Sequence, residues 1–540
     1  MSNSMSDTPI TRRSLIAGTA AAASTIALMK EAVLAGADET PKTGADYKAA
    51  PTPIDDADVT ETVEADVVVV GLGNAGVVAA VTAAEEGAKV FCFQKADTPY
   101  TFGTGVAFPN TTALAAAGIQ NDAWDIVNTI QRSLNENHGK TVMWRNWVNY
   151  GEEVGNWWCK LMDENPELGP SMGVLFPAPD DDNAFNFCYN ATHLASGSLT
   201  VGGEPFFSIA NYIYDNAIEN GADIQARFET PAVQLKVEDG RVTGVYGKGA
   251  DGSIVLAKAA KGVILATGGY SHNMAMRQEY MPLWNKMPSS QVGGGEDGDG
   301  ILMGYWAGGR IEDAPHCAAV HYDPPVDVPN YNGAVVPFLR VNLNGERFSN
   351  EEMSYAYMPF QDTMQPEGCH FQVFDDNYPA DCPDMGQGNL FGDWPTMVPA
   401  ALEAGDLYTG DTIEELAENM GVPVDAFVAT VERYNELCRK GIDEDFGKQT
   451  KRMKPVAKAP FYAFKRHATV LCTMSGLEVT KDYQVVNPNG KVIEGLFAVG
   501  NDSGCMFGGT QYPLNMPGIS IGRALVSGRV AAWRVCGKTE

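Results

Sequence analysis

The sequence predicts an α/β protein with a Rossmann-like dinucleotide-binding fold, and three features support this. Residues 66–70 form a continuous apolar run that suits a buried parallel strand. The run leads into a Gly-x-Gly-x-x-Gly turn at 71–76, and the Ala-rich stretch that follows indicates a helix over 77–86. A second apolar run at 89–93 then completes a βαβ unit of the expected length.

The glycine turn makes a dinucleotide the expected ligand. Gly71 permits a tight turn, Gly73 lets the backbone approach a pyrophosphate, and Gly76 lets the helix pack on the strand. Asn74 and Ala75 complete the loop. The N-terminus of the helix offers N–H groups and a partial positive charge to the phosphates.

Gln94 stands at the end of the second strand, where dinucleotide-binding proteins usually place Glu or Asp against the ribose hydroxyls. Its amide oxygen can accept the same hydrogen bond, although without charge. Lys95 follows it, and both residues are expected to contact the cofactor.

Length and charge narrow the possible functions. A chain of 540 residues exceeds one ordinary core, so two domains are expected. The net charge of −30 argues against nucleic acid and anionic membranes as partners. The same acidity favours a basic redox partner, or it simply aids solubility.

The ten cysteines do not form a recognisable motif. None has the Cys-x-x-Cys spacing of a zinc site, a thioredoxin motif or a haem attachment, so no metal site is expected. Ten scattered cysteines in a long chain are typical of buried free thiols rather than of a disulfide scaffold.

The N-terminus predicts export. Arg12 and Arg13 precede a weakly apolar run at 17–29, and small residues at 35–37 offer a cleavage site. The paired arginines resemble those of a twin-arginine signal peptide, which would extend over 1–37. Its apolar run is shorter than the ~20 residues that a membrane-spanning helix needs. Residues 38–63 are polar and are expected to form a linker. No membrane insertion is expected after the signal is removed.

Two further segments end in glycines, Lys-Gly-Val-Ile-Leu-Ala-Thr-Gly-Gly-Tyr at 261–270 and Gly-Leu-Phe-Ala-Val-Gly-Asn at 495–501. Together with 298–300 (Gly-Asp-Gly) and 345–351 (Gly-x-Arg-Phe-x-Asn-Glu), they resemble the flavoprotein family of soluble fumarate reductases, succinate dehydrogenase flavoproteins and 3-ketosteroid dehydrogenases. In that family the two glycine-ended segments line FAD. The resemblance extends over nearly all of the chain from about residue 64.

The resemblance implies a Rossmann-like FAD-binding domain that is split in the sequence, over 64–310 and 456–540. An α+β capping domain is inserted at 311–455, where helices are expected at 411–420 and 424–440. FAD is expected to be non-covalent, because the usual covalent histidine context is not recognisable. Besides the residues named above, the expected FAD contacts are Gly103, Thr104, Gly105, Val233, Ala266, Thr267, Gly268, Gly500, Asn501, Gly518 and Ile519. The family usually has Glu in place of Asn501.

Three positions depart from the fumarate reductases, which bind a dicarboxylate with arginines and a histidine. Tyr355 stands where they have a proton-donating arginine, and Cys472 where they have a carboxylate-binding histidine. The C-terminal stretch 507–513 also lacks their second arginine. Neutral side chains do not replace a bidentate guanidinium, so fumarate is not the expected substrate.

The replacements match 3-ketosteroid dehydrogenases instead. There, a tyrosine at the spacing of Tyr355 transfers the proton, and the tyrosine of a Tyr-Pro pair, here Tyr512, binds the substrate carbonyl. It is also open whether both are ordinary half-buried aromatic residues. His321 is a further catalytic candidate, whereas His316 is expected to be structural.

Electrons are expected to come from outside the chain, which has neither a second Rossmann motif for NAD(P)H nor a haem-attachment motif. A membrane-linked cytochrome or quinone system would serve a terminal reductase that acts on an activated C=C bond of an enone or enoate. Two alternatives remain: a dehydrogenase that oxidises a ketone or steroid-like substrate, and a non-catalytic flavin-binding redox protein.

Overall fold

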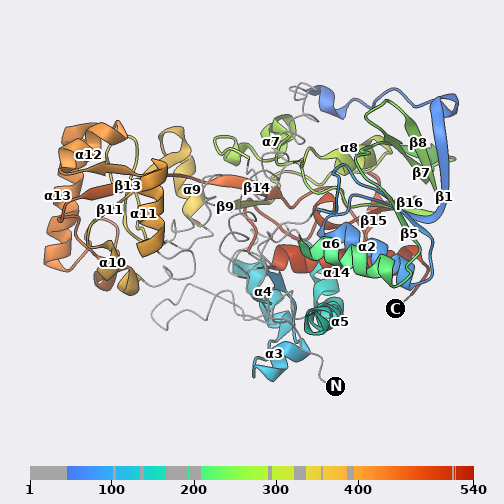
Figure 1. Ribbon diagram of the computed structural model, residues 1–540, viewed down its shortest axis with the longest axis horizontal. Coiled ribbons are helices and arrows are strands. Elements are labelled where there is room, and N and C mark those ends of the chain that lie inside the picture. Colours follow the sequence, from blue (N-terminus) through green and yellow to red (C-terminus); the bar gives the residue numbers. More distant parts are fainter. Residues whose placement is uncertain are drawn as a thin grey trace, which may run out of the picture.

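The computed structural model describes residues 45–100, 105–133, 139–165, 192–193, 208–289, 295–321, 336–353, 357–385, 394–513, 516 and 518–539. The predicted signal peptide lies outside these residues. Figure 1 shows a larger part of the molecule around a central sheet and a smaller part around a second sheet, at the left. Short 3₁₀ turns are η1 (Ala45–Lys48), η2 (Asp56–Asp58), η4 (Pro282–Trp284), η6 (Pro366–Gly368), η7 (Cys382–Met385), η9 (Thr450–Arg452) and η10 (Gly500–Asp502).

The central sheet is Rossmann-like, as predicted, and takes its strands from both ends of the chain. Its order is β15-β16-β8-β1-β2-β5, and all neighbours from β16 to β5 are parallel. The hairpin β6–β7 adds antiparallel strands beside β8. The bounds are β1 (Val59–Val70), β2 (Val90–Phe93), β5 (Ile224–Arg227), β6 (Ala232–Glu238), β7 (Arg241–Lys248), β8 (Ile254–Leu265), β15 (Gln484–Val486) and β16 (Val492–Ala498).

Strand β1 begins inside the segment that was expected to be a linker. Val59 pairs with Ile254, and the pairing of β1 with β8 continues to Val70. Upstream of it, Tyr47 is buried and its hydroxyl donates a hydrogen bond to Glu279. The predicted linker at 38–63 is therefore largely ordered within its described part. A polar strand that pairs through its backbone does not show the apolar run of a buried strand.

Helices α2 (Asn74–Glu85), α6 (Ser208–Glu219) and α14 (Ile519–Val535) lie next to one another along the sheet (Figure 1). Gly528 lets α14 approach α2 closely, because a Cβ there would lie 2.3 Å from the carbonyl oxygen of Ala75. The other elements of this part are α3 (Thr112–Ala116), α4 (Ala123–Ser133), α5 (Thr141–Glu164), α7 (Met274–Tyr280), α8 (Asp299–Trp306), β3 (Val106–Ala107) and β4 (Thr192–His193).

The smaller part is the inserted α+β cap. An antiparallel sheet of order β10-β11-β13-β12 has two hydrophobic clusters of its own, separate from the core of the larger part. The two predicted helices are confirmed as α12 and α13. The bounds are β10 (Leu339–Val341), β11 (Cys369–Asp375), β12 (Tyr408–Gly410), β13 (Phe461–His467), α9 (Met358–Thr363), α10 (Tyr378–Asp381), α11 (Trp394–Ala404), α12 (Ile413–Met420) and α13 (Val424–Lys440).

The cap boundaries differ from the expected 311–455. Strand β13 lies beyond residue 455 and pairs with β11 over its full length. At the other end, Ile311 and the buried residues of 317–320 belong to the core of the larger part. The sequence misplaces both boundaries because they depend on pairings between distant segments.

Strands β9 (Ala318–His321) and β14 (Thr469–Thr473) form an antiparallel pair at the junction of the two parts (Figure 1). Only Ala468, which is fully buried, separates β14 from the cap strand β13. A second link is α9, whose Phe360 ring lies 4.8 Å from the ring of Trp284 in η4. The junction therefore consists of elements that contact both parts.

The Gly-x-Arg-Phe-x-Asn-Glu motif forms a buried ion-pair network in the cap. The Arg347 guanidinium donates to both oxygens of Glu351 at 2.8 Å and to both oxygens of Asp443 at 3.0 and 2.8 Å. Lys448 lies 3.3 Å from Glu351 as a second cation. The Arg347 side chain is 6% exposed and the two carboxylates are fully buried, so the motif fixes the start of the segment after β10.

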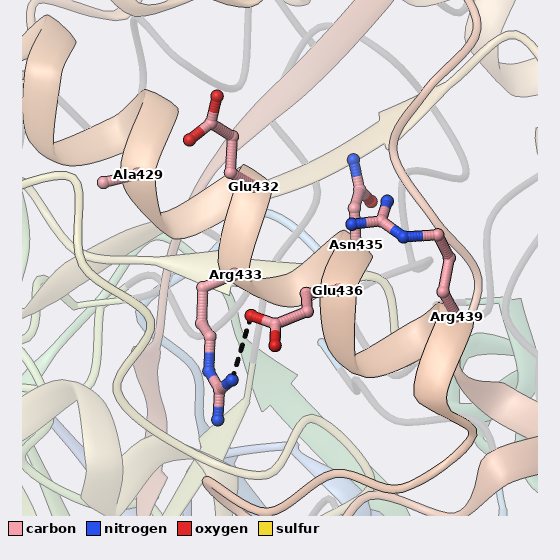
Figure 2. A pocket seen from close by; sticks show the side chains of 6 residues that line it. All are labelled: Ala429, Glu432, Arg433, Asn435, Glu436 and Arg439. Carbon is pink, nitrogen blue, oxygen red and sulfur yellow. Dashed lines mark hydrogen bonds and ion pairs between the residues drawn. The ribbon is translucent and has the colours of Figure 1, made fainter.

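Figure 2 shows a hollow on α13 of the cap, lined by Ala429, Glu432, Arg433, Asn435, Glu436 and Arg439. All six residues come from this one helix, and Arg433 forms an exposed ion pair with Glu436 at 3.1 Å. This charged surface lies at the end of the cap that is far from the central sheet (Figure 1).

None of the helices in the described ranges is long and apolar enough to cross a membrane.

Candidate cofactor and active site

The predicted cofactor segments meet at one edge of the central sheet. The Gly71 amide donates to Phe93 at 2.8 Å, the Ala266 amide to Val70 at 2.8 Å, and the Val499 amide to Leu265 at 2.9 Å. These bonds align the carboxyl ends of β2, β1, β8 and β16. In open α/β sheets, ligands bind in the crevice outside this edge.

The glycine loop after β1 has the geometry of a phosphate cradle. Gly71 has φ +94°, and a Cβ there would lie 2.4 Å from the carbonyl oxygen of Ala266. A Cβ on Gly76 would lie 1.9 Å from the carbonyl oxygen of Gly71. Gly73 caps α2 without a side-chain hydrogen bond, which leaves first-turn N–H groups for an anionic ligand. Asn74 and Ala75 form the first residues of that helix, so the loop fits the pyrophosphate of a dinucleotide.

A second uncapped helix end lies beside the predicted Gly105 segment. Gly518 has φ +81° and caps α14 without a side-chain hydrogen bond, and Ile519 is the first, fully buried residue of that helix. A Cβ on Gly518 would lie 2.7 Å from the carbonyl carbon of Gly105. The predicted contacts Gly103 and Thr104 lie outside the described residues. Val233 lies half-buried on β6.

Gln94 and Lys95 form hydrogen bonds to the loops at this edge of the sheet. The Gln94 amide oxygen accepts from the Leu72 amide at 3.3 Å, and its amide nitrogen donates to the carbonyl oxygen of Thr98 at 2.9 Å. Lys95 donates to the carbonyl oxygen of Gly295 at 3.0 Å and pairs with Asp297 at 2.8 Å. Their direct contact with the cofactor stays a prediction.

Asp502 joins the segments after β8 and β16. Its carboxyl, which is fully buried, accepts from the amide of Thr267 and from the Thr267 hydroxyl at 3.1 Å. The same hydroxyl accepts from the Gly300 amide at 2.8 Å, at the start of α8. Burial raises the pKa of Asp502 to about 8. The carboxyl thus holds Thr267 and Gly300 in place beside Gly268, whose φ is +94°.

Two of the three predicted catalytic residues come together at the junction with the cap. The Tyr512 amide donates to the carbonyl oxygen of Ala318 at 3.1 Å, which brings residues 510–512 alongside β9. The rings of His321 and Tyr512 lie 6.1 Å apart. The Gln511 side chain accepts from the Val320 amide at 2.9 Å and donates to its carbonyl at 3.0 Å, so it fixes this arrangement. Tyr355 lies outside the described residues.

The imidazole of His321 and the thiol of Cys472 at this junction are electrically neutral near pH 7. Burial of its ring lowers the pKa of His321 to about 4, so the imidazole is uncharged near pH 7. Cys472, opposite Ala319 on β14, is buried, and burial raises the pKa of its thiol well above the usual value. The Phe507 ring lies 6.2 Å from that of Tyr512. This surface can donate and accept hydrogen bonds, and none of these groups is a cation that could clamp a dicarboxylate.

The remaining candidates have structural surroundings. His316 is fully buried, with Nδ1 at 2.6 Å from the Tyr270 hydroxyl and Nε2 at 2.8 Å from the carbonyl oxygen of Glu312. It is therefore the structural residue expected. From the sequence, Arg340 could either face the substrate or be a surface charge of a strand; it is 3% exposed on β10, so the surface alternative is wrong. His467, at the end of β13, is exposed.

Among the buried charged residues that the sequence analysis does not identify, Arg523, Asp502 and Glu296 lie near the cofactor edge. Arg523 interrupts an otherwise small and apolar stretch of α14, and Asp502 ends the turn η10 that follows β16. Glu296 lies between a glycine run and the Gly-Asp-Gly turn. A charge inside a segment that is expected to be buried was the available signal.

Comparison with known proteins agrees with this geometry. The family model of the FAD binding domain matches residues 66–515. The vinyl phenol reductase of Lactiplantibacillus plantarum is 27% identical over 86% of this chain and 94% of that protein. The 3-oxosteroid 1-dehydrogenase of Mycolicibacterium smegmatis is 31% identical, and the match spans 58% of this chain and 59% of the dehydrogenase.

The fold is also that of a solved flavoprotein. The open conformation of a flavocytochrome c3 fumarate reductase superposes with a TM-score of 0.68, at 24% identity, over 89% of this chain and 79% of that one. FAD is thus the cofactor that fits the glycine loop and the two uncapped helix ends, and the protein is an FAD-dependent oxidoreductase that acts on CH–CH groups. The chain belongs to the FAD binding domain family.

Proposed function

We propose that this protein reduces an activated C=C bond in an enone or enoate, with electrons from an external carrier. The observation that carries the proposal is the approach of His321 to Tyr512 at the junction with the cap. Cys472 and the stretch 507–513, which contains Tyr512, replace charged clamp residues of the fumarate reductases with neutral ones. The relatives named as a vinyl phenol reductase and a 3-oxosteroid dehydrogenase support a substrate with a phenol or ketone oxygen.

Bound FAD supplies hydride transfer to the carbon β to the activating carbonyl. The Tyr512 hydroxyl donates a hydrogen bond to the carbonyl oxygen and stabilises the negative charge that develops there. Tyr355 transfers its proton to the α carbon and regains one from solvent. His321, which stays neutral, orients the substrate beside Tyr512 through a hydrogen bond. Together the hydride and the proton saturate the double bond.

The opposite direction is the second candidate. A dehydrogenase would use the same residues, with Tyr355 removing the α proton while FAD accepts the hydride. The 31% identity to the 3-oxosteroid 1-dehydrogenase favours this alternative. A non-catalytic flavin-binding redox protein would hold reducible FAD without turnover on any such substrate.

We also propose that the N-terminal segment with Arg12 and Arg13 directs export through the twin-arginine route, which carries proteins already folded around their cofactor. A membrane-linked cytochrome or quinone system would then deliver the electrons. FAD would be held without a covalent bond.

A substrate screen tests the proposal. The dithionite-reduced protein, coupled to a viologen dye, is offered enoates, enones, cinnamate-like acids and vinyl phenols, and reoxidation of the dye is followed. Reoxidation by at least one of them is expected. If none reoxidises the protein while ketosteroids reduce its oxidised form, the reaction runs in the other direction.

Once a substrate is found, two variants test the roles of Tyr355 and Tyr512. Tyr355→Phe should lose about 10²–10⁴ in rate, the usual loss when a general acid is removed. Tyr512→Phe should lose roughly 10²–10³, which is typical for one oxyanion donor. Tyr357→Phe, an exposed tyrosine two positions after Tyr355, is the control. Turnover of Tyr355→Phe within a few-fold of the unaltered protein would remove this residue from the mechanism.

A further inference from the structure

Arg523 is a buried cation next to the cofactor edge of the sheet. It lies in the second turn of α14 and is 2% exposed. Its guanidinium donates to the carbonyl oxygen of Gly500 at 2.8 Å, to that of Ser503 at 3.2 Å, and to the side-chain oxygen of Asn501 at 2.6 Å. It also lies over the Phe507 ring, 5.2 Å from the centroid.

Among the described residues, no carboxylate forms an ion pair with this cation, and the charge of Glu312 acts on it only through space. Across the described part of the chain, no Asp or Glu oxygen lies within ion-pair distance of Arg523. The other two arginines of α14 are paired, Arg529 with Glu85 at 2.9 Å and Arg534 with Asp482 at 2.7 Å. Burying a charge without an ion-pair partner costs free energy of folding. An unpaired buried cation at the cofactor edge of the sheet is therefore a candidate for a functional role.

The neutral side chain of Asn501 leaves the guanidinium without a bonded carboxylate. Related flavoproteins usually have Glu at this position, and a carboxylate there would pair with the guanidinium. The neutral amide instead gives its oxygen to Arg523. Asn501 also hydrogen-bonds Glu296, a buried carboxyl whose pKa is raised to about 7 by burial. Arg523 therefore places a positive charge directly beneath Gly500 and Asn501.

We propose that Arg523 sets the reduction potential of the bound FAD by holding this positive charge beneath Gly500 and Asn501. The inference rests on the proposed contact of these two residues with the cofactor. Uptake of two electrons and one proton gives reduced FAD one more negative charge than oxidised FAD. In a dry environment, a nearby fixed cation stabilises the more negative form, which raises the potential. Arg523 thus acts as a positioning residue, through its charge on the flavin rather than through contact with substrate.

The potential of the FAD-loaded protein tests this without any substrate. Dithionite titration in the presence of a reference dye gives the midpoint by absorbance. Arg523→Gln should lose about tenfold in the ratio of affinities for reduced and oxidised FAD, which is a fall of about 30 mV for a two-electron couple. Arg523→Lys retains the charge and should stay near the unaltered value. Arg529→Gln removes a charge from the same helix away from the cofactor edge, and its potential should not change.

An unchanged potential in Arg523→Gln would overturn the proposal, and so would an equal fall in Arg523→Lys. If Arg523→Gln does not fold or bind FAD, Asn501→Asp provides the second test, because the new carboxylate would neutralise the cation in place. It should lower the potential in the same direction, and an unchanged value would again overturn the proposal. Because no substrate is present, the result is independent of whether the protein proves to be a reductase.

Discussion

Replacing Arg347 by Met should destabilise the cap severely. The side chain makes four charge-assisted contacts of 2.8–3.0 Å with Glu351 and Asp443, whose carboxylates are fully buried. Without the guanidinium, these two negative charges would be left with Lys448 as the single cation of the network. Breaking a buried ion pair by removing one partner typically costs about 3–5 kcal/mol, because a buried charge is left uncompensated.

Urea unfolding of the FAD-loaded protein, followed by tryptophan fluorescence, measures this loss, since Trp394 is buried in the cap. With a slope of about 1–3 kcal/mol/M, the cap transition should move down by about 1 M or more. Arg433→Met is the control on the exposed surface of the cap, where Arg433 pairs with three carboxylates, Glu436, Glu444 and Asp445. Figure 2 shows its pair with Glu436. Exposed ion pairs contribute about 0–1 kcal/mol to the free energy of unfolding. Equal shifts in the two variants would refute the reasoning.

The stability that the Arg347 network contributes should fall as the pH is lowered. Lys448 and Arg347 hold the pKa of Glu351 below its usual value against the effect of burial, and hydrogen bonds from Arg347 do the same for Asp443. A carboxyl whose pKa is depressed by folding contributes stability above its unfolded pKa, and this is lost as the pH falls through the folded pKa. The gap in stability between the unaltered protein and Arg347→Met should therefore narrow in acid, below the unfolded pKa values of about 4.

Further predictions concern the cofactor and export. Gly76→Ala should lower the FAD content measured by absorbance, because its Cβ would lie 1.9 Å from the carbonyl oxygen of Gly71, and full loading would contradict the cradle. Acid denaturation should release all of the flavin as FAD, whereas flavin retained on the chain would indicate a covalent bond. Replacement of Arg12 and Arg13 by Lys should leave a folded, yellow protein in the cytoplasmic fraction, and undiminished export would rule out the twin-arginine route.

The elements that follow from the sequence are those with a local cause. The βαβ unit and its glycine loop are confirmed, because apolar runs and glycine spacing fix them within a short stretch. Helices α12 and α13 begin and end within two residues of their predicted bounds, since Gly421 and Gly441 end them in the left-handed conformation.

The features that the sequence does not reveal depend on distant partners. Strand β13 belongs to the cap through its pairing with β11, which no pattern within 461–467 indicates. The approach of His321 to Tyr512 likewise depends on β9 lying beside the loop 510–512. The contact of Arg523 with Asn501 joins a helix to the end of a strand, so neither residue signals it alone.

The central sheet, with strands from both ends of the chain, constrains how the protein is made on the ribosome. β1, β7 and β8 can pair early, but residues 263–265 of β8 have no partner on the side away from β1 until β16 has been synthesised. An unpaired apolar strand edge can pair with the wrong strand or with another chain. We therefore expect chaperones to bind the nascent chain until β16 is available. Because the cofactor edge is complete only with β16 and α14, we expect flavin loading to follow synthesis through residue 535. The supply of free FAD at that moment, rather than during elongation, should govern how much chain reaches the native state.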